Sequence, residues 1–207
     1  MRPVRRAVAA FVVLPLLLAA CTGPAGTDDG SGAAPVQTHV DVDTPQLRQA
    51  KQAAGIEDCA PGAGSPAADG LPDVTLPCLG GGPAVQLDRL RGPMVVNLWA
   101  QWCGPCREEL PYYQRLHEEA GDRVAVLGID WQDTRPDAAL ELAEQAGVTY
   151  PLLADPAAET KAELKVRGLP GVVFVDRDGT VRHVEYTVIR SYDQLRELVN
   201  QHLDVTV

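Results

Sequence analysis

The sequence has few aromatic residues and few basic ones. Aromatic side chains make up 5% of its 207 residues, and 18 Lys and Arg stand against 28 Asp and Glu, which gives a formal net charge of −10. Nucleic acid and anionic lipid surfaces repel a chain with this balance, so we expect neither as a ligand. The 45% share of hydrophobic residues nevertheless indicates a globular protein.

Motifs of metal, haem and nucleotide sites are also missing. The chain has one Cys-x-x-Cys, Cys103 to Cys106, with no histidine directly after it, and Cys59 and Cys78 lie far away at irregular spacing. The four histidines do not cluster, so we expect no metal site, no attached haem and no other cofactor. The glycines at 80–82 lack a following Gly-Lys-Ser/Thr and indicate a turn, not a phosphate loop.

No apolar run is long enough to cross a bilayer comfortably, which takes about 20 residues. The run from Ala7 to Leu18 follows Arg2, Arg5 and Arg6, a pattern typical of a signal peptide over residues 1–20. Leu18-Ala19-Ala20-Cys21 resembles the bacterial lipobox, in which the signal is cut before a cysteine that is then diacylated. We therefore expect Cys21 to be lipidated and the protein to be extracytoplasmic and lipid-anchored to the cell membrane. The alternative is an ordinary signal peptide with a spare cysteine.

Composition divides the remaining chain into three parts. Residues 21–43 are rich in Gly, Ala, Pro and Asp and predict a flexible tether. Residues 44–70 predict a short helix and loop, with Thr44 as N-cap, Pro45 at the first helical position and Gly55 as the stop. Residues 71–207 then form one domain.

The order of elements in that domain predicts an α/β fold. Strands and helices are expected, in chain order, at 73–77 and 84–87 (a β-hairpin), 94–99 (strand), 103 onward (helix), 123–130 (strand), 137–146 and 157–167 (helices), 172–176 and 180–186 (strands) and 192–202 (helix). This order favours a central mixed sheet flanked by helices, with parallel strands first and an antiparallel pair last, and with an N-terminal β-hairpin extension.

The Cys103–Cys106 pair stands where a buried strand passes into a helix. The unpaired amides of the helix N-terminus carry partial positive charge, which favours the thiolate of Cys103. Cys106 follows one turn later, so the two sulfurs can meet, and Gly104 and Pro105 permit and stiffen the turn. The pattern indicates a redox dithiol; a purely structural disulfide is the alternative.

The stretch Trp99-Ala100-Gln101-Trp102-Cys103-Gly104-Pro105-Cys106 resembles the active site of the thioredoxin superfamily. Its continuation, Arg107-Glu108-Glu109-Leu110-Pro111, resembles the extracytoplasmic TlpA/ResA-like branch. The resemblance implies a thioredoxin fold over about residues 71–204, with Cys103 as the exposed nucleophile, Cys106 as the buried resolving cysteine and a helix kinked at Pro111.

The same resemblance implies a cis-proline at Leu169-Pro170 that faces the dithiol; a trans loop proline is the alternative. Leu169 would offer its backbone to an extended substrate segment. Trp102, Gly104, Pro105, Leu169 and Pro170 are thus the expected substrate-binding residues. Gly171 departs from the Thr or Ser common in the family at the next position.

The proton chemistry differs from that of classical thioredoxin. Asn97 occupies the position of a buried Asp and cannot transfer protons, so the resemblance gives Glu109, one turn beyond Cys106, the catalytic proton-transfer role. Glu109 as a plain surface residue is the alternative. Trp131 is expected either to edge the substrate groove or to serve packing alone.

Cys59 and Cys78 are expected to form a structural disulfide. It would close a loop of about 20 residues and contribute about 3 kcal/mol. The alternative is a second redox pair that exchanges electrons with Cys103.

These observations predict a membrane-tethered thiol-disulfide oxidoreductase. The resemblance implies that it reduces cysteines of exported proteins such as apocytochrome c and receives electrons from a transmembrane donor of the CcdA/DsbD type. Two other functions stay open. The same dithiol can act as a disulfide donor in oxidative folding, or the lipoprotein can be a non-catalytic binding module or metallochaperone.

Overall fold

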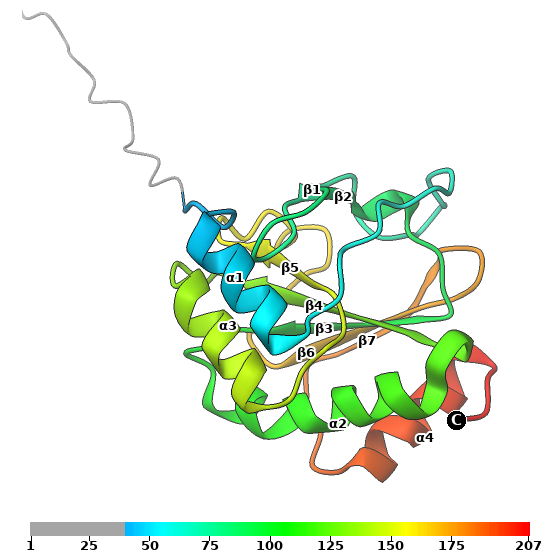
Figure 1. Ribbon diagram of the computed structural model, residues 1–207. Coiled ribbons are helices and arrows are strands. Elements are labelled where there is room, and N and C mark those ends of the chain that lie inside the picture. Colours follow the sequence, from blue (N-terminus) through cyan, green and yellow to red (C-terminus); the bar gives the residue numbers. More distant parts are fainter. Residues whose placement is uncertain (1–39) are drawn as a thin grey trace, which may run out of the picture. The chain divides into compact units, whose positions relative to one another are not determined.

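The computed structural model describes residues 40–207 (Figure 1). The expected signal peptide, the expected lipidation site Cys21 and the expected tether as far as residue 39 lie outside the described residues. Residues 40–43, the end of that tether, pack on the domain instead: Val42 is buried, and its carbonyl accepts the Gly80 N–H at 2.9 Å. Within residues 40–207, no helix has both the length and the apolar composition that a membrane span requires.

A five-stranded mixed sheet forms the centre of the fold, in the order β5-β4-β3-β6-β7. Its strands are β3 (Met94–Trp99), β4 (Ala125–Trp131), β5 (Leu152–Asp155), β6 (Gly171–Val175) and β7 (Val181–Glu185). The first three are parallel to one another, whereas β6 pairs antiparallel with both β3 and β7. The predicted α/β fold, with parallel strands first and an antiparallel pair last, is confirmed.

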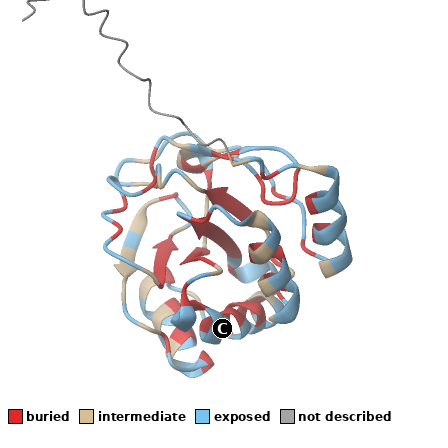
Figure 2. Cartoon of the chain, turned by 90° about the vertical axis from the view of Figure 1, so that its left-hand side faces the viewer, coloured by how far each residue is buried: buried red, intermediate tan, exposed pale blue. Residues whose placement is uncertain are grey.

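Both faces of the sheet are covered. Alternate residues of β6 enter two separate hydrophobic cores: Val172 and Phe174 face one, Val173 and Val175 the other. Every residue of β3 is buried, which explains why this central strand is almost uniformly apolar in sequence. Figure 2 shows the buried strands in red at the centre of the molecule.

Within residues 40–207, four α-helices pack on one face of the sheet, in the core that contains Val172 and Phe174: α1 (Pro45–Ala54), α2 (Gly104–Ala120), α3 (Pro136–Gln145) and α4 (Tyr192–Leu203). Helix α2 packs against α4, and α1 packs against α3 (Figure 1). Two short 3-10 helices span Leu87–Arg89 and Gly121–Arg123. Helix α1 has the predicted ends, because Thr44 accepts a hydrogen bond from the Leu47 N–H and Gly55 takes the left-handed conformation.

The expected N-terminal hairpin is present but short. Strands β1 (Thr75–Leu76) and β2 (Val85–Gln86) pair antiparallel, and the turn between them contains the three glycines 80–82, all at positive φ. Cys78 forms an isolated bridge with Leu153, which fastens the hairpin to the edge strand β5.

The helix predicted over residues 157–167 is wrong. The carboxylate of Asp155 accepts hydrogen bonds from the N–H groups of Glu159 (2.7 Å) and Thr160 (3.1 Å), and the chain then makes a series of turns. Leu164 N–H still bonds to the Thr160 carbonyl as in a helix, but Lys165 has a φ of 53°, which no α-helix accommodates. The turns bring Leu164 and Val166 into a hydrophobic core, so tertiary packing outweighs the local helical preference.

Candidate active site

The two cysteines of the motif form a disulfide at the start of α2. Their Cα atoms lie 5.3 Å apart, and Cys103 is the N-cap residue, with its sulfur accepting the Cys106 N–H at 3.3 Å. This contact places the Cys103 sulfur at the positive end of the helix, where a thiolate is stabilised. The strand-to-helix junction expected from the sequence therefore positions the pair.

The expected exposure of Cys103 is not found in this oxidised state. Its exposed fraction is 4%, against 1% for Cys106, because the bond to Cys106 holds the Cys103 sulfur against the first turn of α2. Next to it, Trp102 is the one large apolar side chain among residues 40–207 that is exposed, at 51%. Gly104 and Pro105 are also exposed, so the surface beside the dithiol is accessible although its sulfurs are covered.

A loop after β4 holds the motif in place, and the sequence did not predict this. The carboxylate of Asp133 accepts the Gln101 N–H at 2.8 Å through Oδ2 and the Arg135 N–H at 2.9 Å through Oδ1. The Trp102 indole N–H donates to the Gln132 carbonyl at 3.2 Å. The sequence did carry a signal for this contact: Asp133 comes soon after β4, which is parallel to β3, and the carboxyl ends of parallel strands lie at the same edge of a sheet.

A second acidic residue, Asp130, lies buried at the end of β4, opposite Trp99 of β3. Burial, together with the neighbouring carboxyl of Asp133, raises the pKa of Asp130 well above its ordinary value. Asp130 is therefore favoured in its protonated form. It lies near the Asp133 side chain that accepts the Gln101 N–H.

Glu109 is buried, with 1% of its surface exposed, so the interpretation of it as a surface residue is wrong. Its Oε1 accepts the Ile189 N–H at 2.6 Å, whereas Oε2 has no hydrogen-bond partner within the described residues. Burial raises the pKa of Glu109 from 4.5 to about 7; the Ile189 hydrogen bond opposes the shift and the charge of Glu108 adds to it. Glu109 can thus gain or lose a proton near neutral pH, one turn beyond Cys106.

Asn97 is buried in the middle of β3 and donates through Nδ2 to the Tyr150 hydroxyl at 3.4 Å. Burial raises the pKa of Tyr150 above its ordinary value, so neither partner exchanges protons near neutral pH. Glu109 is left as the buried carboxyl group of α2 one turn beyond Cys106.

The Leu169–Pro170 peptide bond is cis. Gly171, the next residue, pairs with Leu98 near the carboxyl end of β3, so the cis-proline lies at the edge of the sheet from which the Cys103 motif begins. Pro170 is buried and Leu169 is half-buried. Gly171 leaves room for an aromatic ring, since a Cβ there would lie 2.9 Å from the ring of Tyr186. A second cis bond, Gly92–Pro93, was not predicted.

Other candidates lie away from this site. Trp131 is 4% exposed and belongs to the hydrophobic core on the other face of the sheet from Cys103, so it serves packing. Cys59 and Cys78 form a disulfide with a Cα–Cα distance of 5.9 Å, and both are buried. Among residues 40–207, no group of three or more His, Cys, Asp or Glu side chains is arranged to hold a metal ion.

The family model described as AhpC/TSA matches residues 67–184, more than half of the chain. The chain belongs to the AhpC/TSA family. The matched region of this AhpC/TSA member begins before the hairpin and contains the Cys103 motif, Glu109 and the cis-proline.

Curated relatives of this AhpC/TSA member have names from thiol chemistry. The chain is 39% identical over 90 residues to the thiol:disulfide interchange protein DsbE of Allochromatium vinosum, covering 43% of this chain and 48% of the relative. It is 29% identical over 104 residues to the thiol-disulfide oxidoreductase ResA of Oceanobacillus iheyensis, covering 48% and 53%. The chain thus spans about half the length of these relatives.

Solved structures agree with the thioredoxin-like fold. A secreted thiol-disulfide isomerase from Corynebacterium glutamicum superimposes with a TM-score of 0.56 at 26% identity, covering 65% of this chain and 86% of that chain. MTB DsbF superimposes with the same TM-score and identity, covering 62% and 94%. The thioredoxin fold predicted from the motif is confirmed.

Proposed function

We propose that this protein is a thiol-disulfide oxidoreductase that acts through Cys103 and Cys106. The observation that carries the proposal is the position of the pair: two cysteines within bonding distance at the N-terminus of α2, at the same sheet edge as a cis-proline. A helix N-terminus lowers the pKa of a thiol, and a thiolate is the species that attacks disulfides. The names of the relatives support the same chemistry.

In the reducing direction, the Cys103 thiolate attacks one sulfur of a client disulfide. A mixed disulfide forms, and the other client sulfur leaves as a thiolate that takes a proton from the solvent. Cys106 then loses its proton and attacks the Cys103 sulfur, which releases the second client thiol and leaves the Cys103–Cys106 disulfide. Glu109 acts as the proton acceptor for Cys106, because its pKa of about 7 allows it to accept a proton near neutral pH.

The client is held beside the dithiol. Trp102, exposed at 51%, together with Gly104 and Pro105, provides an uncovered contact surface, and Leu169 offers backbone groups next to the cis-proline. Reduction breaks the bond that holds the Cys103 sulfur against α2, so the side chain is then free to turn toward a client bound on this surface.

We further propose where the protein is located and with which proteins it exchanges electrons. The protein acts on cysteines of exported proteins such as apocytochrome c, is anchored outside the cytoplasm through a lipid on Cys21 and is kept reduced by a transmembrane donor of the CcdA/DsbD type. The resemblance of residues 18–21 to a lipobox and the DsbE and ResA names of the relatives support this. The Cys59–Cys78 bond ties the segment after α1 to the hairpin.

Reduction of insulin disulfides by the full chain tests the activity. Cys103→Ala is expected to lower the rate to that of dithiothreitol alone, whereas Lys161→Met, a change at an exposed surface residue, leaves it intact. A Cys103→Ala variant with normal activity would refute the mechanism. The reduction potential of the pair, and its redox state in cells, decide the direction: a mainly oxidised pair in cells would contradict the reductase and favour a disulfide donor.

A further inference from the structure

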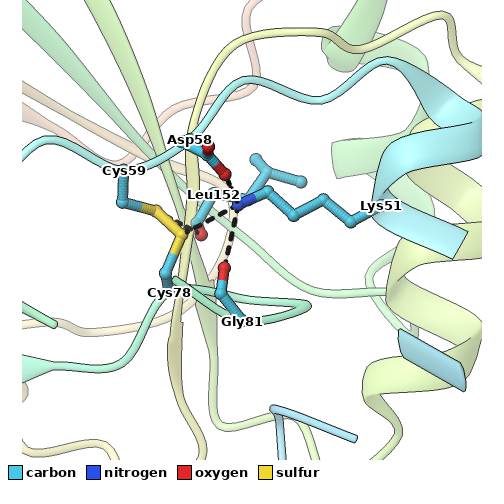
Figure 3. The surroundings of a disulfide bond; sticks show 6 residues. All are labelled: Lys51, Asp58, Cys59, Cys78, Gly81 and Leu152. Atoms are coloured by element: carbon cyan, nitrogen blue, oxygen red, sulfur yellow. Dashed lines mark hydrogen bonds and ion pairs between the residues drawn. A yellow bond between two sulfur atoms is a disulfide. The ribbon is translucent and has the colours of Figure 1, made fainter. Parts of the chain in front are cut away.

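A buried lysine lies against the second disulfide. Lys51 of α1 is 3% exposed, and its Nζ lies 3.3 Å from the Cys78 sulfur, 2.9 Å from Asp58 Oδ1 and 2.9 Å from the Gly81 carbonyl oxygen (Figure 3). The Asp58 side chain is 89% exposed, so water screens its attraction for the ammonium. The contact of the ammonium with Cys78, by contrast, is buried.

The contact between Lys51 and Cys78 stabilises the two redox states of the cysteine pair to different extents. A neutral disulfide sulfur gains little from a neighbouring ammonium, whereas a thiolate at the same place gains an ion pair that water screens only weakly. Lys51 therefore stabilises the reduced pair more than the oxidised one. Among residues 40–207, Lys51 is the charged side chain that hydrogen-bonds to these sulfurs; Arg48, Glu57 and Asp58 line the hollow, and β5 contributes the Leu152 carbonyl, 3.3 Å from the Cys59 sulfur.

A hollow of about 420 Å³ lies beside Lys51, whose Nζ contacts the buried Cys78 sulfur. It is lined by Lys51, Asp58 and the glycines 80–82, together with Arg48, Gln52, Ile56 and Glu57. A Cβ at position 82 would lie 3.5 Å from the Cys78 sulfur, so Gly82, which lines the hollow, lies directly against this buried atom. The positive charge of Lys51, one of the lining residues, also attracts an anionic thiolate.

We propose that Cys59–Cys78 is a second thiol-disulfide exchange site, separate from Cys103, whose reaction partner is a dithiol and whose reduced form holds Cys78 as a thiolate paired with Lys51. One thiolate of the dithiol attacks the Cys78 sulfur; the Cys59–Cys78 bond breaks, and Cys59 leaves and takes up a proton. The second sulfur of the dithiol then attacks the mixed disulfide and releases Cys78 as the thiolate. The dithiol ends as a disulfide, two electrons reach the cysteine pair, and one proton passes to the solvent.

The test uses the full chain with Cys103→Ser and Cys106→Ser, so its result is independent of the proposed oxidoreductase activity. The protein is equilibrated with graded ratios of reduced and oxidised dithiothreitol, alkylated, and analysed by peptide mass spectrometry for Cys59 and Cys78. Lys51→Met is expected to lower the equilibrium constant for reduction at least tenfold, equivalent to about 30 mV. Lys161→Met, the same change at an exposed lysine, is expected to leave it unchanged.

A variant that raises the equilibrium constant for reduction distinguishes an electrostatic effect of Lys51 from a general loss of folding. Asp58→Asn removes the competing partner of Lys51 and is expected to raise the same equilibrium constant by about threefold, the size of an exposed ion pair. In a Cys59→Ser variant, thiolate absorbance is expected to show Cys78 ionising below the ordinary thiol pKa of about 8.5. A folded Lys51→Met with an unchanged equilibrium, a decrease with Asp58→Asn, or a Cys78 pKa at or above about 8.5 would each overturn the proposal.

Discussion

Asp133 and Gln101 are joined by a hydrogen bond of 2.8 Å, from the Gln101 N–H to the Asp133 carboxylate, two residues before Cys103. The two residues come from loops that follow neighbouring parallel strands, β3 and β4. The same carboxylate accepts the Arg135 N–H, so it fastens the start of the motif to the loop before α3. The position of Cys103 therefore depends on residues some 30 positions later in the chain.

Asp133→Ala is expected to lower the free energy of unfolding by about 1–3 kcal/mol, because two backbone N–H groups lose their acceptor. The rate of disulfide exchange falls as well, since the loop before Cys103 is no longer held. Urea unfolding and insulin reduction measure the two effects. Asp133→Asn keeps one acceptor oxygen and should lose less; equal losses in both variants would contradict this account.

Glu109→Gln is expected to change the pH dependence of both stability and exchange. The pKa of Glu109 is about 7 in the folded protein against 4.5 ordinarily, so the folded state binds more protons between these values. Its contribution to stability is complete below pH 4.5 and is lost as the pH rises through about 7. Gln stays neutral, so unfolding measured from pH 4 to 8 should vary less.

The exchange rate of Glu109→Gln should lose its dependence on a group titrating near pH 7, because the acceptor for the Cys106 proton is gone. Glu108→Gln is the matched control, since Glu108 is the exposed neighbour on the same helix. A rate profile that Glu109→Gln leaves unchanged would exclude the proton-transfer role while leaving the stability effect intact.

Cys106→Ala is expected to trap clients. The Cys103 thiolate still forms the mixed disulfide, but no second sulfur attacks it, so covalent complexes accumulate and turnover stops. Non-reducing gels of the variant with an exported cysteine-containing protein should show the adduct, and Cys103→Ala should show none. Adducts that form equally in both variants would indicate that another cysteine reacts.

Gly171→Thr is expected to destabilise the protein by about 1–3 kcal/mol through overpacking. A Cβ at this position would lie 2.9 Å from the ring of Tyr186, whose hydroxyl donates to the Leu164 carbonyl. The smaller side chain in Tyr186→Leu should recover part of the loss in the double variant, as measured by thermal unfolding. A simple sum of the two single losses would show that the ring is not the obstacle.

Local sequence signals predicted the elements whose ends carry a recognisable capping or motif residue. Thr44 and Gly55 delimit α1 as expected, and the apolar run before Cys103 forms the buried strand β3. The segment 157–167 had helical composition without a comparable local determinant. There the Asp155 carboxylate and the burial of Leu164 and Val166 impose turns that composition does not encode.

The sequence by itself determined the dithiol, its place at a strand-to-helix junction and, through the motif, the thioredoxin fold, because these depend on neighbouring residues and short spacings. Only the tertiary structure decided the surroundings of the sulfurs. Burial that raises the pKa of Glu109, the acceptor role of Asp133 and the contact of Lys51 with Cys78 join residues distant along the chain. Such long-range contacts exist only after the sheet and helices have packed, so no local pattern records them.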